Sequence, residues 1–341
     1  MAKEKDYVLQ VKHLATKFRV GKKIVNSVND ASFNIERGTT LGIVGESGCG
    51  KSVTATSIMQ LLPKYGNITN GEILFNPGDG REVMDLAKMD RKSKEMRSLR
   101  GKDISMIFQD PLSSLDPVYT IGTQIMENLM NHETVTKEEG KERVIKLLRE
   151  LGIPAPEQRF DGYPHEFSGG MKQRVMIAMG MICNPTILIA DEPTTALDVT
   201  IQAQILKLIK EMQKEYGTSV MLITHNMGIV AEVCDQVAVM YMGRVVEFGN
   251  LEQIFNNPKH PYTAALLRSV PVLGMGKDAE LESIDGSTPD ASDVFEGCEF
   301  EPRCTHACEK CRLAHPEARE IEEGHIVRCW LFENEGEKVD E

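Results

Sequence analysis

Residues 39–52 read TTLGIVGESGCGKS, and this stretch decides the fold. An apolar run at 41–44 leads into Gly45-Glu46-Ser47-Gly48-Cys49-Gly50-Lys51-Ser52, which fits the pattern G-x-x-x-x-G-K-[S/T]. In this pattern the glycines let backbone N–H groups curl around phosphate oxygens, and the following helix adds its positive end. Residues 52–62, SVTATSIMQLL, have the apolar spacing of such a helix. The stretch therefore predicts a phosphate-binding loop between a buried strand and a helix.

Further along the chain, short apolar runs alternate with amphipathic patterns. TILIA at 186–190 and SVMLIT at 219–224 are continuous apolar runs, which are typical of buried parallel strands. QAQILKLIKEMQKEYG at 202–217 predicts an amphipathic helix that ends at Gly217, and MG at 242–243 predicts a turn between two strands. Residues 7–44 have the pattern of strands with turns. Since about 113–183 carry mostly helical patterns, we predict an α/β fold with a helical subdomain there.

The length and charge of the chain indicate two regions. The 341 residues are enough for about two domains, which we place at 1–272 and 273–341. Residues 276–341 hold 19 acidic and 7 basic residues, which accounts for the whole net charge of −12. The second region is therefore predicted to be an acidic linker followed by a cysteine-rich extension. Neither region has the basic excess of a nucleic-acid binder, so no nucleic-acid partner is predicted.

The sequence predicts neither a signal peptide nor a membrane-spanning helix. The first 20 residues mix charges with apolar residues and lack the apolar run of a signal peptide. No stretch approaches the roughly 18 apolar residues of a membrane helix. We therefore expect a soluble, intracellular chain in which thiols stay reduced, and clustered cysteines there indicate metal or cluster ligands before disulfides.

Two further motifs end in groups suited to nucleotide chemistry. Asp191 and Glu192 close the apolar run at 187–190. Asp191 suits a Mg²⁺ contact, and Glu192 suits orienting or deprotonating an attacking water. Ser168 is a natural helix N-cap, and Gly169 and Gly170 allow a phosphate to approach the positive end of that helix. Taken singly, Asp191 and Glu192 also fit solvated acids at the end of a strand, and Ser168 also fits an ordinary helix cap.

Together the motifs resemble those of the ATP-binding cassette ATPases over about residues 7–265. FSGGM at 167–171 stands where LSGGQ is commonest, and TTALD at 194–198 stands where STALD is frequent. The resemblance implies a nucleotide-binding fold with a RecA-like core, an antiparallel β subdomain and a helical subdomain. The matching positions are Lys51 (Walker A), Gln109 (Q-loop), 168–174 (signature), Asp191 and Glu192 (Walker B and catalytic glutamate), 196–198 (D-loop) and His225 (switch histidine).

The resemblance also implies roles for these residues. ATP would lie between the phosphate loop of one chain and the signature of a second, so the site would need a dimer. Glu192, His225 and Lys51 are implied as catalytic, and Ser52, Gln109 and Asp191 as Mg²⁺ ligands. The implied ATP-binding set is Phe18, Ser47, Gly48, Cys49, Gly50, Lys51, Ser52, Val53, Gln109, Ser168, Gly169, Gly170, Asp191, Glu192 and His225.

Two members of this set have open questions attached. Phe18 stands where an aromatic residue would stack on adenine, and a core aromatic in a strand is an equal alternative. Cys49 lies in the phosphate loop, so we expect thiol reagents to block ATP binding. Cys49, Cys183 and Cys234 are otherwise expected to be ordinary buried or loop residues.

Two segments and a cysteine pattern narrow the resemblance. QDPLSSLDPVYTIG at 109–122 and NPKHPYTAALLRSVP at 257–271 resemble the ATPase subunits of dipeptide and oligopeptide importers. In that group the chain continues as GC-x₅-C-x₆-C-x₁₇-C, which here gives Cys298, Cys304, Cys311 and Cys329. Four thiolates can hold a [4Fe–4S] cluster or a tetrahedral zinc ion, and the spacing alone does not choose. The resemblance implies the cluster, and Cys308 is additional.

The resemblance finally implies a function. It is that of an ATP-hydrolysing subunit that energises import of dipeptides or oligopeptides, bound peripherally at the cytoplasmic face of the cell membrane. The implied partners are a related ATPase subunit, two membrane permease subunits and an extracellular peptide-binding protein. The alternatives are an importer ATPase for nickel or another small solute, and a soluble cassette ATPase outside transport. The 116 residues from Ser52 to Ser168 leave no room for the long coiled-coil insertion of DNA-repair cassettes.

Overall fold

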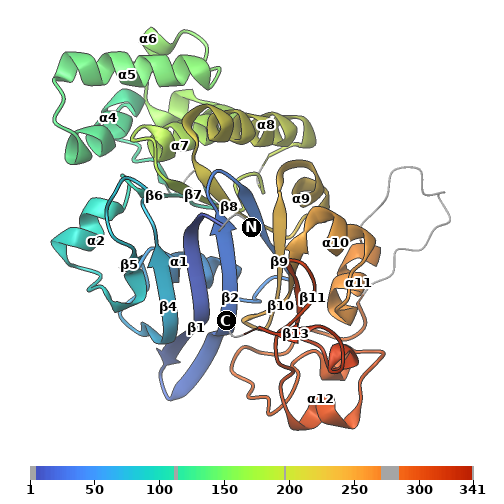
Figure 1. Ribbon diagram of the computed structural model, residues 1–341. Helices are drawn as coiled ribbons and strands as arrows, with labels where there is room; N and C mark the ends of the chain where they lie inside the picture. The colour runs from blue at the N-terminus through green and yellow to red at the C-terminus, as the bar shows by residue number, and fades with distance from the viewer. Residues whose placement is uncertain (1–4, 111–113, 196, 270–283, 340–341) are drawn as a thin grey trace.

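The computed structural model describes residues 5–110, 114–195, 197–269 and 284–339. Strands from these ranges form one continuous sheet in the order β5-β4-β1-β2-β10-β9-β3-β8-β7-β6. Figure 1 shows this sheet with a layer of helices above it and the C-terminal segment beside β10. The sheet has an antiparallel part, from β5 to β2, and a parallel part, from β9 to β6.

The antiparallel part is built from N-terminal residues. It contains β1 (Tyr7–Val20), β2 (Lys23–Glu36), β4 (Gly66–Phe75) and β5 (Met84–Asp85). β1 lies between β2 and β4, and Leu9 pairs with both Ile35 and Phe75. All three side chains are fully buried, so one face of this part covers apolar core. The strands predicted at 7–44 are confirmed as β1, β2 and β3 (Thr40–Val44).

The parallel part forms the centre of the molecule. β3 lies between β8 (Ser219–Thr224) and β9 (Gln236–Tyr241), and β7 (Ile187–Asp191) and β6 (Ile104–Ile107) follow beyond β8. Adjacent strand residues point to opposite faces of the sheet. Leu188 therefore belongs to the apolar core on one face, and Ile189 belongs to the core on the other face. The parallel strands predicted at 186–190 and 219–224 are therefore confirmed.

A hairpin joins the two parts of the sheet. β9 and β10 (Arg244–Asn250) are antiparallel and turn at Met242 and Gly243, as predicted. Both turn residues have positive φ, +45° and +80°, which matches the twist of the flanking strands. β10 then lies beside β2, where Arg244 is opposite Asp30.

Helices cover the parallel strands. The helix after the phosphate loop, α1 (Lys51–Ile58), contacts β1, β2 and β7. The helix predicted at 202–217 is confirmed as α8 (Val199–Tyr216), which begins earlier because Asp198 caps it. It ends at Gly217, whose φ is +69°. Further helices are α2 (Lys94–Leu99), α9 (Met227–Val233), α10 (Leu251–Asn256) and α11 (Pro261–Arg268), and α9 contacts α8.

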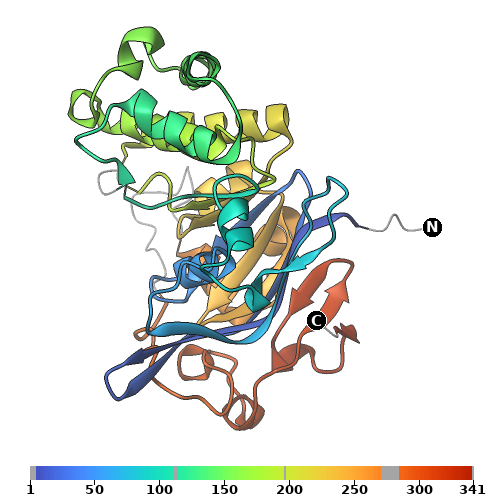
Figure 2. The same cartoon turned by 90° about the vertical axis from the view of Figure 1, so that its left-hand side faces the viewer.

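A layer of helices lies above the sheet at the top of Figures 1 and 2, and its α7 packs against β6. It consists of α4 (Ile121–His132), α5 (Lys137–Glu150), α6 (Pro156–Phe160) and α7 (Gly169–Met181). These helices fall inside the range where a helical subdomain is predicted, although residue 113 at its start lies outside the described residues. α5 begins with a capping box, in which Thr136 and Glu139 bind each other's backbone N–H groups.

The C-terminal segment, 284–339, extends the sheet. Its elements are α12 (Glu309–Leu313), β11 (Arg319–Glu322), β12 (His325–Val327) and β13 (Glu337–Lys338). β12 pairs with β10, and the buried His325 Nε2 lies 2.8 Å from the buried Glu247 Oε1 of β10. The sequence did not indicate this attachment. The predicted boundary at 272/273 and the start of the acidic linker fall outside the described residues.

Asp30 of β2 is the polar centre of the junction between these parts. Its Oδ2 lies 3.1 Å from both Arg244 Nη1 of β10 and Arg328 Nη1 of the C-terminal segment, and its Oδ1 lies 2.9 Å from His13 Nδ1 of β1. Burial alone would raise the pKa of Asp30, but the two guanidinium groups and His13 hold that pKa below its ordinary value. The ionised carboxylate therefore joins three segments that are distant in sequence.

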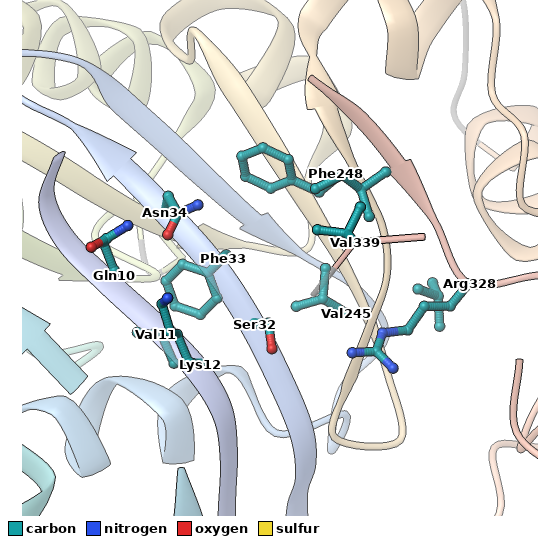
Figure 3. A pocket seen from close by; sticks show the side chains of 12 residues that line it. Gln10, Val11, Lys12, Ser32, Phe33, Asn34, Val245, Phe248, Arg328 and Val339 are labelled. Carbon is teal, nitrogen blue, oxygen red and sulfur yellow. The ribbon is translucent and has the colours of Figure 1, made fainter. Parts of the chain in front are cut away.

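A cavity of about 120 Å³ lies beside this junction, as Figure 3 shows. Phe33 of β2, Val245 and Phe248 of β10, and Val339 line it together with Arg328. Among the described residues, its lining contains no carboxylate, histidine or cysteine side chain. It therefore lacks the groups that phosphoryl transfer needs.

Asp30→Asn should lower the free energy of unfolding at pH 7 by about 1–3 kcal/mol, less than for a fully buried pair because Asp30 is partly exposed. The pKa of Asp30 is lower in the native than in the unfolded state. Its contribution is therefore present above about pH 4 and is lost as the pH falls through the native pKa. Urea unfolding of both proteins at pH 7 and pH 3 measures this, and the difference between them should shrink at pH 3.

The matched control is Glu317→Gln, which removes a carboxylate paired with Lys338 at an exposed site. Exposed ion pairs contribute little, so this variant should unfold like the wild type. Equal losses in the two variants would show that Asp30 has no special role at the junction.

Candidate active site

The phosphate loop is pressed against the strands behind it. Gly45 and Gly50 have φ of +151° and +102°, and a Cβ on either would lie within 2.3 Å of a backbone oxygen, of β9 in one case and β2 in the other. Glycine is therefore required at both positions. The N–H of Gly243, in the β9–β10 turn, donates to the Cys49 carbonyl at 2.9 Å. The shape of the loop is thus set by β2 and by the β9–β10 hairpin.

Lys51 and Cys49 are both buried in this loop, and Lys51 Nζ lies 3.8 Å from Cys49 Sγ. Lys51 Nζ donates to the carbonyl oxygens of Gly45 at 2.8 Å and of Glu46 at 3.0 Å. The Cys49 side chain is only 1% exposed, and burial raises the pKa of its thiol although Lys51 opposes that shift. A reactive cysteine needs access and thiolate character. The expectation that thiol reagents reach Cys49 in the folded protein is therefore wrong.

Two oxygen ligands face each other where the loop meets β7. Ser52 Oγ donates to Asp191 Oδ1 at 3.0 Å. Burial raises the pKa of the Asp191 carboxyl, while the hydrogen bond from Ser52 opposes the rise. A hydroxyl and a carboxylate oxygen are ligands that Mg²⁺ prefers, so this pair fits a magnesium ion. Gln109, the third predicted ligand, instead contacts Glu192, the residue that follows Asp191.

The Glu192 carboxylate is held by three side chains. Its Oε2 accepts hydrogen bonds from Gln109 Nε2 and Thr195 Oγ1, both at 2.9 Å, and its Oε1 lies 3.0 Å from His225 Nδ1. Burial would raise the pKa of Glu192, but the bonds with His225 and Thr195 outweigh it and lower that pKa. The backbone of Glu192 has a φ of +46°, a strained conformation that is common at functional sites. An ionised carboxylate is thus fixed at the end of a buried strand.

The loop and these side chains line one cavity of about 570 Å³, within the size range of small-ligand sites. Its lining residues are Ser27, Ser47, Gly48, Gly50, Lys51, Ser52, Val53, Gln109, Glu192, Thr195 and His225. All of these except Ser27 and Thr195 belong to the predicted ATP-binding set. Thr195 could have been inferred from its place three residues after Glu192. Ser27 gave no sequence signal, because only the folding of β2 over the loop brings it there.

Other predicted residues lie away from this cavity. Phe18 of β1 packs over Gly66 of β4, and its ring centre is 6.0 Å from that of Tyr65. Ser168 caps α7, where its Oγ accepts a hydrogen bond from the Met171 N–H at 3.4 Å. Neither Phe18 nor the 168–170 segment is among the described residues that line the cavity, and Ala196 of the D-loop is not described. The signature segment therefore lies apart from the phosphate loop of its own chain.

The cysteines of the C-terminal segment line a second cavity, of about 60 Å³. Its walls contain Cys298, Cys304, Cys308, Cys311 and Cys329, together with His306, Phe300 and Trp330. The structure thus brings together the four predicted ligands and the additional Cys308, whose Sγ is 3.5 Å from that of Cys311. Burial raises the pKa of the Cys298 and Cys329 thiols to about 12.

The thiols that line this cavity do not form a metal site in this arrangement. Within 5–110, 114–195, 197–269 and 284–339, no group of three or more His, Cys, Asp or Glu side chains is placed to hold a metal ion. The cysteine cavity therefore gathers the ligand type that zinc and iron–sulfur clusters use, but not in a ready metal-binding geometry.

The fold and the cavity in front of the phosphate loop are those of an ATP-binding cassette ATPase, and the comparisons with known proteins agree. The family model described as "ABC transporter" matches residues 28–195, and that described as "Oligopeptide/dipeptide transporter, C-terminal region" matches 246–311. The dipeptide transport ATP-binding protein DppD of Bacillus subtilis (strain 168) is 49% identical over 97% of this chain and 96% of its own length. The oligopeptide transport ATP-binding protein OppD of the same organism is 47% identical, over 98% and 91%.

Solved structures show the same fold. The dimeric ATP-binding cassette MJ0796, in a post-hydrolysis state bound to ADP and Pi, has a TM-score of 0.62 and 26% identity, over 71% of this chain and 98% of its own. The structure of cbiO1 from Clostridium perfringens has a TM-score of 0.60 and 31% identity, over 74% and 92%.

The chain therefore belongs to the DppD/OppD family of ABC transporter ATPases, which energise the import of dipeptides and oligopeptides. This membership confirms the predicted cassette fold, ATPase activity and role in peptide import. ATP and Mg²⁺ are the typical ligands of such ATPases. Helices in the part of the chain that the structure describes do not reach the length and apolar character needed to cross a bilayer.

Proposed function

We propose that this chain hydrolyses ATP in the cavity in front of the phosphate loop. The observation that carries the proposal is the Glu192 carboxylate, which Gln109, Thr195 and His225 fix at the wall of that cavity. Lys51 lies on the same wall and would neutralise the β- and γ-phosphates. The backbone N–H groups at the start of α1 add the positive end of a helix dipole.

The proposed roles follow from the contacts of each side chain. Mg²⁺, when bound, would be held by Ser52 and Asp191 with Gln109 nearby, and it would offset charge that develops on the phosphates. Glu192 would orient and deprotonate the attacking water, because its low pKa keeps it ionised and able to accept a proton. His225 would hold Glu192 in place and contact the γ-phosphate.

A second cassette would complete the site. The segment 168–170 lies at the N-terminus of α7 and outside the cavity of its own chain, where its N–H groups remain available to a phosphate of a partner. The dimeric state of the MJ0796 cassette supports this arrangement. We propose a related ATPase subunit as the partner, and Phe18 as the residue that stacks on adenine.

Glu192→Gln should retain ATP binding and lower the ATP turnover of the assembled transporter by about a hundredfold or more, because the amide cannot accept the proton of the water. Phosphate release and equilibrium binding of ATP, measured on the same preparation, separate the two effects. Glu211→Gln, on an exposed face of α8, is the control and should match the wild type. Turnover at the wild-type rate in Glu192→Gln would remove Glu192 from its proposed role.

Membership of the family gives peptides as the cargo of the complete transporter. The relatives are named for dipeptide and oligopeptide transport, which supports peptides over nickel or another small solute and over a role outside transport. The partners would be two membrane permease subunits and an extracellular peptide-binding protein, with this chain peripheral at the cytoplasmic face of the membrane.

A groove between the sheet and the helical layer would receive the permease. It has a volume of about 530 Å³ and is lined by α7 and by residues of β6 and its flanks. Leu61 and Phe108 lie in its lining and are 39% and 43% exposed, and Met106 and Met179 add flexible apolar surface. An exposed apolar groove between the sheet and the helical layer suits the apolar face of a short helix from a membrane subunit.

Leu61→Asp should abolish co-purification with the permease subunits from detergent-solubilised membranes, because it places a charge in the apolar groove. ATP binding by the isolated chain should be unchanged, since Leu61 does not line the nucleotide cavity. Val20→Asp changes a residue that is 58% exposed at the end of β1, away from the groove, and should leave assembly intact. Full assembly of Leu61→Asp would place the permease elsewhere.

We further propose that Cys298, Cys304, Cys311 and Cys329 hold a [4Fe–4S] cluster, with zinc as the alternative. The cavity offers thiols enclosed by apolar and aromatic groups, which fits a cluster ligand set. A cluster, when bound, would keep these thiols deprotonated.

Protein purified without oxygen should show a broad absorption band near roughly 400 nm from sulfur-to-iron charge transfer, whereas zinc is silent there. Cys298→Ser should remove most of the band and of the bound iron. Cys308→Ser, outside the proposed ligand set, is the matched control and should keep both. Stoichiometric zinc without iron in the wild type would decide for the alternative.

A further inference from the structure

The second residue of the phosphate loop, Glu46, is anchored on three sides. Its N–H donates to the hydroxyl of Tyr262, in α11, at 2.9 Å. Its carbonyl oxygen accepts from Lys51 Nζ at 3.0 Å. Its carboxylate forms a paired contact with Arg303, in which Nη1 lies 2.6 Å from Oε2 and Nη2 lies 3.0 Å from Oε1. Two of the three anchors therefore come from the C-terminal part of the chain.

Arg303 is fixed in its own surroundings. Its side chain is only 4% exposed, and its Nε donates to the carbonyl of Asp285 at 3.0 Å. The guanidinium carbon lies 5.9 Å from the ring centre of Tyr241 and 6.0 Å from that of Phe300. A guanidinium held on its sides and faces presents a rigid fork to the Glu46 carboxylate. The contact can therefore transmit a displacement as well as neutralise a charge.

The same arginine belongs to the cysteine-rich segment. It ends the 3-10 turn Glu301–Arg303, and Cys304 is the next residue. The turn begins where the Glu301 N–H donates to the Cys298 carbonyl, at 3.0 Å, and it closes where the Cys304 N–H donates to the Glu301 carbonyl, at 3.2 Å. Two of the thiols that line the cysteine cavity thus lie at the two ends of the turn that carries Arg303.

Aromatic side chains fill the space between the two cavities. The rings of Tyr241, Tyr262 and Phe300 contact one another, with centres 4.7, 5.2 and 5.4 Å apart. Tyr262 reaches the phosphate loop, whereas Phe300 lines the cysteine cavity. Densely packed side chains transmit shifts instead of absorbing them.

We propose that Arg303 is a positioning residue for the phosphate loop, and that through it the cysteine-rich segment sets the affinity of the nucleotide site. Without Arg303, the Glu46 carboxylate would keep its negative charge in a loop that must accept phosphates, and it would keep only a hydrogen bond from Thr288 Oγ1, at 3.2 Å, in place of the paired ionic contact. The inference rests on the proposed ATP site and concerns its regulation.

The first test is the affinity of the full-length chain for a fluorescent ATP analogue. Arg303→Met should weaken binding by about tenfold, toward the low end of measured coupling between sites. Arg303→Lys should recover part of the loss, because it restores the charge without the paired geometry. In the assembled transporter, Arg303→Met should raise KM for ATP more than it lowers kcat, since Glu192 and His225 are not in contact with Arg303.

Arg312→Gln is the matched control. Arg312 lies in the same segment beside Cys311 and pairs with Glu301, but it is exposed and does not contact the loop. This variant should bind the analogue like the wild type. Equal weakening by Arg303→Met and Arg312→Gln would overturn the inference, because general loosening of the segment would then explain both.

A double variant distinguishes the effect of the unpaired Glu46 charge from a general loosening of the segment. Glu46→Gln combined with Arg303→Met leaves no unpaired charge, so it should bind the analogue more tightly than Arg303→Met alone. Additive weakening in the double variant would contradict a direct link between the two side chains.

The link to the cysteines has its own test. Cys304→Ser should weaken binding of the analogue in the wild-type background and add nothing in the Arg303→Met background. Additive effects would show that the cysteine cavity does not act through Arg303. Failure of the proposed function has a different signature: the wild type itself would not bind the analogue, or Lys51→Ala would bind it equally well.

Discussion

The phosphate loop packs against the β9–β10 turn so closely that both backbones need glycine there. Gly50 of the loop and Gly243 of the turn face each other, and a Cβ on Gly50 would lie 3.4 Å from the Gly243 Cα. A Cβ on Gly243 would come within 3.0 Å of the β2 backbone. Backbone therefore packs against backbone at this point, and only glycine permits it. The contact fixes the loop, and it also fixes where β10 begins.

β10, the strand that begins at that turn, connects the part of the sheet behind the phosphate loop with the C-terminal segment that holds the cysteine cavity. β10 pairs with β9 and contacts β2, and β12 of the C-terminal segment pairs with it. The cysteine-rich segment is thereby placed within reach of the loop, where Arg303 meets Glu46. Asp191 and Glu192, the proposed Mg²⁺ ligand and base, lie at the carboxyl end of β7. Parallel strands direct their carboxyl ends to one edge, which is where α/β sheets bind ligands.

Much of the fold and of the nucleotide site could be predicted from local patterns. The strands at 7–44, the hairpin at Met242–Gly243 and the helix that ends at Gly217 each follow from residues adjacent in sequence. The cavity lining agrees with the predicted set because the loop is contiguous and because Glu192 and His225 end neighbouring strands. The inaccessibility of the Cys49 thiol to reagents was missed, since a motif specifies the backbone path of a loop but not which side chains face inward.

Spacing along the chain was enough to find the phosphate loop, the apolar strands at 186–190 and 219–224, and the four cysteines of the C-terminal pattern. Only the tertiary structure decided that Ser27 lines the nucleotide cavity, that β12 joins the sheet and that Arg303 pairs with Glu46. These contacts join residues far apart in sequence, and no local propensity encodes them. They arise when the chain buries its apolar faces, and the partners of each polar group are then set by the packing around it.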